Sequence, residues 1–107
     1  MRAVVLKEYG SLDNLDLMEF PDPIPGPEEI IVDVRATAVN YVDLVLIGGT
    51  YQFRPEIPLV PGKGPAGVVK AVGENVHDFA PGDRVLAMAE QGGYAEFAPI
   101  HRNNCYR

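Results

Sequence analysis

The sequence predicts a mainly β domain, a barrel or sandwich of short strands that carries one short helix. Segments rich in apolar and β-branched residues recur along the 107-residue chain, bounded by Gly, Pro, Asn or Asp. One segment instead combines a helix-capping residue with a terminal glycine pair. A chain of this length forms one domain with a modest hydrophobic core, so we expect all of these elements to share one fold.

The first two predicted strands are Arg2–Lys7 and Leu15–Phe20, separated by the turn-rich sequence Tyr9-Gly10-Ser11. Prolines then alternate with other residues from Pro21 to Pro27. Because proline fixes φ and lacks a backbone donor, this stretch is expected to be an extended loop and not a strand inside a sheet.

The clearest strand pattern is Glu29–Ala38, in which Ile30, Val32, Val34 and Ala36 alternate with the residues between them. Three further strands are predicted after it, each preceded by a glycine- or proline-containing turn. They are Gly67–Val72, Arg84–Met88 and Tyr94–Ala98.

A short helix is predicted for Tyr41–Ile47. Asn40 precedes it as a candidate N-cap, and Gly48-Gly49 follows it as a terminator. Six of these seven residues are apolar, and Asp43 is the one polar position. A helix that is apolar nearly all round is buried. We therefore expect Asp43 to mark its solvent side, and a surface outside this chain to cover part of the helix.

Composition excludes several classes of function. The formal net charge is −6, which argues against nucleic-acid binding, since that requires a basic surface. Lys and Arg are scattered, and the apolar run after Met1 is too short for a secretory signal. No stretch approaches the roughly 20 apolar residues of a membrane span. Cys105 is the only cysteine, which excludes an internal disulfide. We expect a cytoplasmic protein that binds neither nucleic acid nor membrane.

Residues Gly62–Gly67 match the dinucleotide-binding pattern G-x-G-x-x-G letter for letter. That pattern binds a pyrophosphate only where a strand precedes it and a helix follows. Here Pro58 and Pro61 interrupt the approach, and the residues that follow have a strand pattern. We expect a glycine-rich turn at this position and no Rossmann domain in this chain.

An ordered set of motifs nevertheless resembles one enzyme superfamily. P-G-K-G-P-A-G-V-V-K-A-V-G-E-N-V (Pro61–Val76) is followed by F-A-P-G-D-R-V (Phe79–Val85) and G-G-Y-A-E-F (Gly92–Phe97). Together with the initial M-R-A-V-V, these resemble the medium-chain dehydrogenase/reductases, specifically the zinc-independent quinone oxidoreductases. The resemblance implies a GroES-like partly open β-barrel, with residues 1–107 as the catalytic-type domain of a longer two-domain enzyme.

The same comparison argues against zinc. Zinc-dependent members place a Cys one turn before their Asp and use a G-H-E triplet, where this chain has Asn40 and Gly62-Lys63-Gly64. A protonated Lys and two glycines supply no ligand, and catalytic zinc needs about three protein ligands. The remaining candidate ligands are irregularly spaced: Asp43, His77, His101 and Cys105. We expect no metal site.

The resemblance implies that Asn40 and Tyr51 line the nicotinamide and substrate cleft as catalytic residues. It also makes Asn40, Tyr41 and Lys63 the candidate cofactor-binding residues. The expected cofactor is NADPH or NADH, held mainly by a domain absent from this chain. Two alternatives stay open, because Asn40 could serve purely as an N-cap and Lys63 could be a solvated surface residue.

The function implied is hydride transfer from a nicotinamide to a quinone or enone without zinc, and the full-length protein is expected to be a homodimer. The isolated chain is expected to be inactive without its dinucleotide-binding domain. One alternative is a free-standing GroES-like binding or assembly module without catalysis. Another is a zinc alcohol dehydrogenase with displaced ligands.

Overall fold

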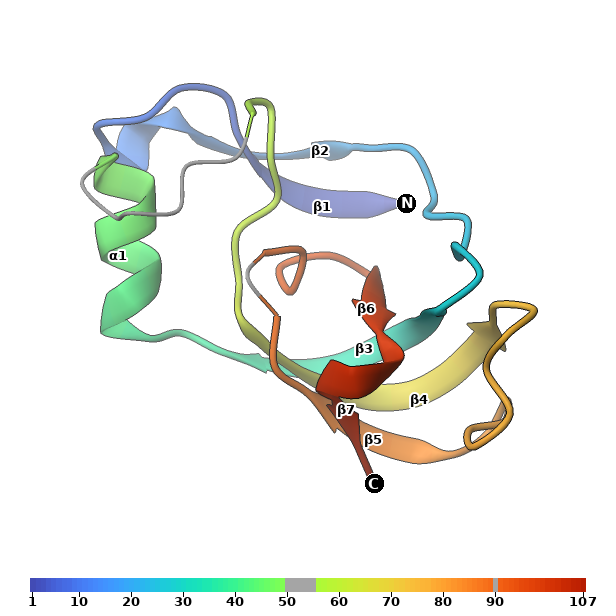
Figure 1. The fold of residues 1–107 in the computed structure, drawn as a ribbon. Coiled ribbons are helices and arrows are strands. Elements are labelled where there is room, and N and C mark those ends of the chain that lie inside the picture. The colour runs from blue at the N-terminus through green and yellow to red at the C-terminus, as the bar shows by residue number, and fades with distance from the viewer. Residues whose placement is uncertain (50–55, 90) are drawn as a thin grey trace.

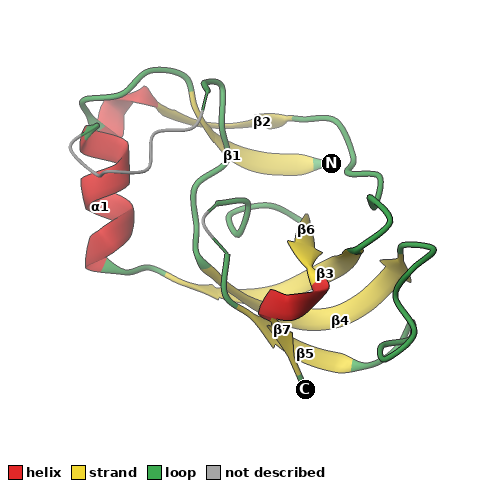
Figure 2. Ribbon diagram, in the orientation of Figure 1, coloured by secondary structure: helices red, strands yellow, loops and turns green. Residues whose placement is uncertain are grey.

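The computed structural model describes residues 1–49, 56–89 and 91–107. Its elements follow one another along the chain as shown in Figures 1 and 2. They are β1 (Arg2–Leu6), η1 (Leu12–Asn14), β2 (Leu15–Glu19), β3 (Glu29–Ala38), α1 (Tyr41–Gly48), β4 (Gly64–Val72), β5 (Arg84–Ala87), β6 (Phe97–His101), η2 (Arg102–Asn104) and β7 (Cys105–Tyr106).

Two antiparallel sheets form a half-barrel. β1 and β2 make a two-stranded sheet, and the other strands make a five-stranded sheet in the order β6-β3-β4-β5-β7. Figure 1 shows the β1–β2 hairpin opposite the larger sheet, with α1 at one end. Backbone bridges from Ala3 to Ala95 and from Leu6 to Leu59 connect the hairpin to the rest of the fold. This is the mainly β, partly open barrel expected from the sequence.

The main hydrophobic core lies against the five-stranded sheet. Ile30 and Val32 of β3 are fully buried, and Val69 of β4 is 2% exposed. They pack with buried residues of β5, β6 and β7. Burying one such side chain stabilises the fold by about 1.5–3 kcal/mol, so Ile30 and Val32, the first two positions of the predicted β3 alternation, hold the sheet to its core.

A second cluster attaches α1 to the hairpin. Leu46 and Ile47 of α1 pack with Leu6 of β1 and with Leu59. The backbones of Leu6 and Leu59 exchange hydrogen bonds of 2.7 and 3.1 Å. The apolar face of the helix is therefore anchored against β1 and the segment before β4.

A β-bulge interrupts the pairing of β3 with β4 between Val34 and Ala36. Gly67 lies beside it on β4, where a Cβ would come within 2.0 Å of the carbonyl oxygen of Asp33. The two backbones therefore approach more closely than any side chain allows, and position 67 requires glycine.

The sequence located most elements correctly but misplaced two boundaries. β4 begins at Gly64, not Gly67, because β3 is long enough to pair Ala38 with Gly64. The predicted strand Tyr94–Ala98 was placed three residues too early: β6 runs from Phe97 to His101. The Tyr94 carbonyl instead accepts the N–H of Val4 in β1, and the Tyr94 N–H donates to the carbonyl of Pro61, which precedes β4. The two-residue strand β7 was not predicted.

The G-x-G-x-x-G sequence is confirmed as a turn that enters a strand. Gly64–Val72 is β4, and every strand pair in the described part of the chain is antiparallel. A dinucleotide-binding crossover requires parallel strands with a helix between them.

No described helix is long and apolar enough to cross a membrane.

Candidate functional site

Two of the predicted site residues lie at the same end of one strand pair. Asn40 follows β3, Lys63 precedes β4, and the β3–β4 register pairs Ala38 with Gly64 just inside them. Tyr41, the first residue of α1, is 80% exposed. The structure thus brings Asn40, Tyr41 and Lys63 to one edge of the half-barrel. The prediction for Tyr51 falls outside the described residues.

Asn40 occupies the N-cap position of α1, as predicted. Its backbone is extended, with φ −117° and ψ 158°. Asp43, three residues later, accepts the backbone N–H of Asn40 through Oδ2 at 3.0 Å. An acidic residue at this position completes a capping box, and its negative charge is stabilised by the positive end of the helix dipole. The Asn40 residue itself is exposed at the start of the helix.

The expectation that Asp43 marks the solvent side of α1 was wrong. Asp43 is 1% exposed, whereas the apolar residues Tyr41 and Leu44 are 80% and 45% exposed. The reason is a partner distant in sequence: the hydroxyl of Tyr94 donates to Asp43 Oδ2 at 2.8 Å. A buried carboxylate is tolerated where donors satisfy it, and here two donors meet at one oxygen.

Tyr94 is held in place by backbone contacts on both sides. Its N–H donates to the carbonyl of Pro61 at 2.9 Å, and its carbonyl accepts the N–H of Val4 at 2.8 Å. Its ring lies against Gly62, where a Cβ would come within 2.8 Å of Tyr94 Cδ1. Burial raises the pKa of the Tyr94 phenol above its usual value, and the neighbouring Asp43 raises it further. The phenol therefore remains a hydrogen-bond donor at neutral pH.

The pairing of Tyr94 with Asp43 was not predicted from the sequence. Tyr94 belongs to G-G-Y-A-E-F, which contributed to the family resemblance, and Asp43 was noted only as the polar position of the helix. Their 51-residue separation leaves no local pattern that would connect them.

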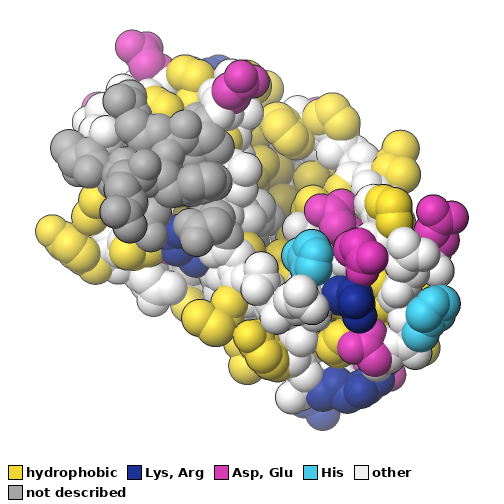
Figure 3. Space-filling model, in the orientation of Figure 1, with side chains coloured by type: hydrophobic (Ala, Val, Ile, Leu, Met, Phe, Trp, Pro, Cys, Tyr) yellow, Lys and Arg dark blue, Asp and Glu magenta, His cyan; other side chains and the backbone are white. Residues whose placement is uncertain are grey.

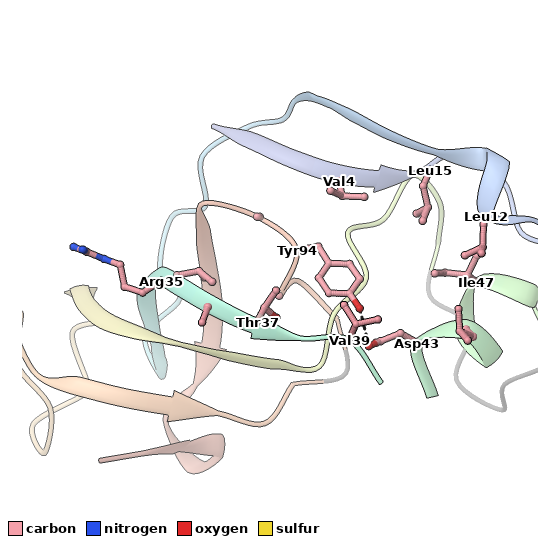
Figure 4. Close-up of a pocket in the computed structure, with 14 residues that line it drawn as sticks. Val4, Leu12, Leu15, Arg35, Thr37, Val39, Asp43, Ile47 and Tyr94 are labelled. Carbon is pink, nitrogen blue, oxygen red and sulfur yellow. Dashed lines mark hydrogen bonds between the residues drawn. The ribbon is translucent and has the colours of Figure 1, made fainter. Parts of the chain in front are cut away.

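A groove of about 600 Å³ opens beside this pair. Figure 4 shows the Tyr94 ring between Val4 of β1 and Thr37 of β3, with its hydroxyl toward Asp43. Other lining residues are mostly apolar and include Leu15 and Ile47. Asn40, Tyr41 and Lys63 do not line it. The groove therefore borders this edge through Val39, Asp43 and Leu44 at the start of α1, without contact to the predicted site residues themselves.

Potential metal-ligating side chains are scattered over the described part of the chain. Within residues 1–49, 56–89 and 91–107, no three His, Cys, Asp or Glu side chains gather closely enough to hold a metal ion. Cys105 is buried, and burial raises the pKa of its thiol. That thiol is therefore a weaker ligand than a free cysteine. A zinc-free site stays a prediction.

Comparison with known families agrees with this architecture. Residues 26–107 match the family model for the alcohol dehydrogenase GroES-like domain. Quinone oxidoreductase from Lama guanicoe is 38% identical over 109 residues, covering 100% of this chain and 33% of that protein. Synaptic vesicle membrane protein VAT-1 homolog from Rattus norvegicus is 40% identical over 98 residues, covering 90% and 24%. The chain thus spans about one third or less of these relatives.

Solved structures show the same fold. The human synaptic vesicle membrane protein VAT-1 homolog-like protein has a TM-score of 0.94 at 36% identity, covering 100% of this chain and 34% of that one. Escherichia coli quinone oxidoreductase complexed with NADPH has a TM-score of 0.88 at 27% identity, covering 98% and 32%. A cobalt- and zinc-bound alcohol dehydrogenase from Pyrobaculum aerophilum has a TM-score of 0.89 at 30% identity, covering 99% and 40%.

These similarities extend to both an NADPH-bound quinone oxidoreductase and a metal-bound alcohol dehydrogenase, so proteins of both kinds share this fold. They do agree with the antiparallel half-barrel and with the motifs between Pro61 and Phe97. The chain therefore belongs to the alcohol dehydrogenase GroES-like domain family of the medium-chain dehydrogenase/reductases, with quinone oxidoreductases and VAT-1 homologues as its relatives.

Proposed function

We propose that this chain is the catalytic-type domain of an NADPH-dependent, zinc-free quinone oxidoreductase, with NADH as the alternative cofactor. Its substrate would be a quinone or an enone. The observation that carries this proposal is the likeness to quinone oxidoreductases over the whole chain. At the edge beside Asn40, moreover, the Gly62-Lys63-Gly64 turn offers no metal ligand where zinc-dependent members have one.

Asn40 suits the role of orienting a substrate or cofactor carbonyl. Its amide offers two donors and one acceptor, and it stands at the exposed N-terminal end of α1. That end of a helix favours negative charge. When bound, the nicotinamide supplies the hydride. The substrate oxygen then gains negative charge, which the Asn40 amide and the helix end would stabilise without a metal.

Tyr41 follows Asn40 as the first residue of α1, and Lys63 lies at the same edge, just before β4. In this proposal the exposed Tyr41 ring provides a flat apolar surface for the cofactor, and the Lys63 ammonium attracts a cofactor phosphate. The exposed amide, the aromatic ring and the cation together fit the mixed polar and apolar character of a nicotinamide dinucleotide. Tyr51 stays a predicted member of the cleft.

A second domain is required by this proposal. The chain spans about one third of the quinone oxidoreductases it matches, and the start of α1 exposes Val39, Tyr41 and Leu44. Figure 3 shows hydrophobic side chains on the surface beside α1. We propose that a dinucleotide-binding domain covers this surface and holds most of the cofactor, and that the complete protein is a cytoplasmic homodimer.

The proposal is tested with the product of the full coding sequence, by following the loss of NADPH absorbance with 1,4-benzoquinone as acceptor. We expect NADPH oxidation that a chelator does not abolish. Asn40→Ala should lower kcat about 10²-fold, the usual cost of losing one oriented donor. Asn103→Ala, the same change at an exposed residue of η2, should leave kcat unaltered. Absence of quinone-dependent NADPH oxidation would contradict the proposal.

A second candidate is a GroES-like binding or assembly module without catalysis. It is favoured by a second exposed apolar group at the β5–β7 edge, where Leu86 pairs with Tyr106 and Met88 follows. Size-exclusion chromatography with light scattering separates the two. A defined ring of the 107-residue chain would favour the module, whereas irregular self-association would favour a domain that lacks its partner surface.

A further inference from the structure

We propose that Tyr94 is a positioning residue, which acts through Asp43 to hold Asn40 in the orientation that hydride transfer requires. This inference rests on the proposed function, because it concerns how Asn40 is presented to the reacting groups. It assigns a role to two residues that need not touch either substrate or cofactor.

Tyr94 has a fixed place that does not depend on α1. Its backbone N–H and carbonyl bond to Pro61 and Val4 at 2.9 and 2.8 Å. Its ring fills the space that a side chain at Gly62 would otherwise occupy. Tyr94 is thereby tied both to β1 and to the turn that contains Lys63. A hydroxyl on this ring is consequently a rigid reference point.

One carboxylate oxygen connects this reference point to the site. Asp43 Oδ2 accepts the Tyr94 hydroxyl at 2.8 Å and the Asn40 N–H at 3.0 Å. Asp43 is 1% exposed, so water cannot easily replace either donor. Its other oxygen, Oδ1, is buried and has no hydrogen-bond partner in the described part of the chain. The orientation of the carboxylate is therefore set through Oδ2.

Together these contacts link the two halves of the proposed site. The turn at Gly62-Lys63 lies against Tyr94. The Tyr94 hydroxyl is hydrogen-bonded to Asp43, and Asp43 in turn is hydrogen-bonded to Asn40. Removing the Tyr94 hydroxyl leaves the carboxylate with Asn40 as its one donor at Oδ2, free to rotate. A shift of about 1 Å in a catalytic group can cost about 10²-fold in rate. We expect kcat to fall while cofactor binding is preserved.

A double-mutant cycle on the complete protein tests this inference, with NADPH and 1,4-benzoquinone as the probes. Tyr94→Phe keeps the ring against Gly62 and removes only the hydroxyl. It should lower kcat by about 10- to 100-fold, with little change in KM for NADPH. In the Asn40→Ala background the same change should cost less than about twofold, because residues that act as a unit are not additive. Tyr106→Phe, the same change at an exposed residue of β7, is the matched control and should leave kcat unaltered.

Independent, multiplicative losses from Tyr94→Phe and Asn40→Ala would overturn the positioning role and leave the proposed function standing. If Asn40→Ala has no effect on kcat, the proposed role of Asn40 fails instead. Amide hydrogen exchange of Asn40 then decides whether the link itself exists. Tyr94→Phe should speed exchange of the Asn40 N–H by about tenfold or more, since opening becomes easier, and Tyr106→Phe should not. Unchanged exchange would contradict the inference.

Circular dichroism checks that Tyr94→Phe folds. If it does not, Asp43→Asn takes its place in the cycle, because it keeps the shape of the side chain but removes the charge that both donors share. It should show the same loss of kcat and the same dependence on Asn40. A loss that persists in full in the Asn40→Ala background would again exclude the positioning role.

Discussion

Gly62 lies directly against Tyr94. A Cβ on Gly62 would come within 2.8 Å of both the ring carbon Cδ1 and the backbone nitrogen of Tyr94, and the φ angle of Gly62 is +105°. Two separate costs therefore oppose any side chain at this position. One is the left-handed backbone conformation and the other is overlap with a neighbour whose backbone cannot move freely.

These costs can be separated by comparing Gly62→Ala with Gly82→Ala. Gly82 has a similar φ of +98° but nothing within 4 Å of a Cβ. Gly82→Ala should lose only the conformational term, about 1–2 kcal/mol. Gly62→Ala should lose that and roughly 1–3 kcal/mol more from overlap. Urea unfolding monitored by circular dichroism provides the measurement. Equal losses in the two variants would show that the contact with Tyr94 relaxes easily.

The bulge in β3 makes a second prediction, which concerns two glycines of β4. Gly67→Ala places a Cβ within 2.0 Å of the Asp33 carbonyl oxygen, whereas Gly64→Ala places one 3.8 Å from Ala38. Gly67→Ala should destabilise the fold by about 3 kcal/mol or more, because β3 and β4 must move apart to admit the Cβ. Gly64→Ala should be neutral or stabilising by about 0.4–1 kcal/mol through the unfolded chain. A comparison of their urea midpoints tests both expectations.

The attachment of α1 gives a third prediction. Leu46 is fully buried in the cluster with Leu6 and Leu59, whereas Leu44 on the same helix is 45% exposed. Leu46→Ala should lower the free energy of unfolding by about 2–5 kcal/mol, because it removes buried surface and leaves a cavity. Leu44→Ala makes the same change in helix propensity as Leu46→Ala and should cost less than about 1 kcal/mol. Similar losses would mean that α1 does not rest on β1 as described.

The Tyr94 phenol gives a prediction about pH. Its pKa is raised above 10.0 by burial and by Asp43. Because the pKa is higher in the folded state, the protonated phenol contributes its full stabilisation at pH values below its pKa in the unfolded state. The effect is lost as pH rises through the folded value. In a spectrophotometric titration of the folded protein up to about pH 11, Tyr94→Phe should leave the phenolate absorbance change at its wild-type amplitude. A reduced amplitude would show that Tyr94 ionises in the ordinary range.

Several elements could be predicted because their signals lie in neighbouring residues. Alternation from Ile30 to Ala36 identified β3, and the combination of Asn40 with Gly48-Gly49 identified α1 and both of its ends. Proline and glycine context also showed that Gly62–Gly67 enters a strand. Local backbone preferences and the apolar pattern of adjacent side chains determine these features, so the amino-acid order alone was enough.

Tertiary contacts decided the remaining features. Asp43 is the polar residue of an apolar helix, yet it is buried, because Tyr94 supplies a donor from 51 residues away. Tyr94 looked like the start of a strand, but its hydrogen bonds to Val4 and Pro61 hold it outside β6. A hydrogen bond between distant segments depends on how the whole chain packs. The propensity of either segment alone therefore could not show it.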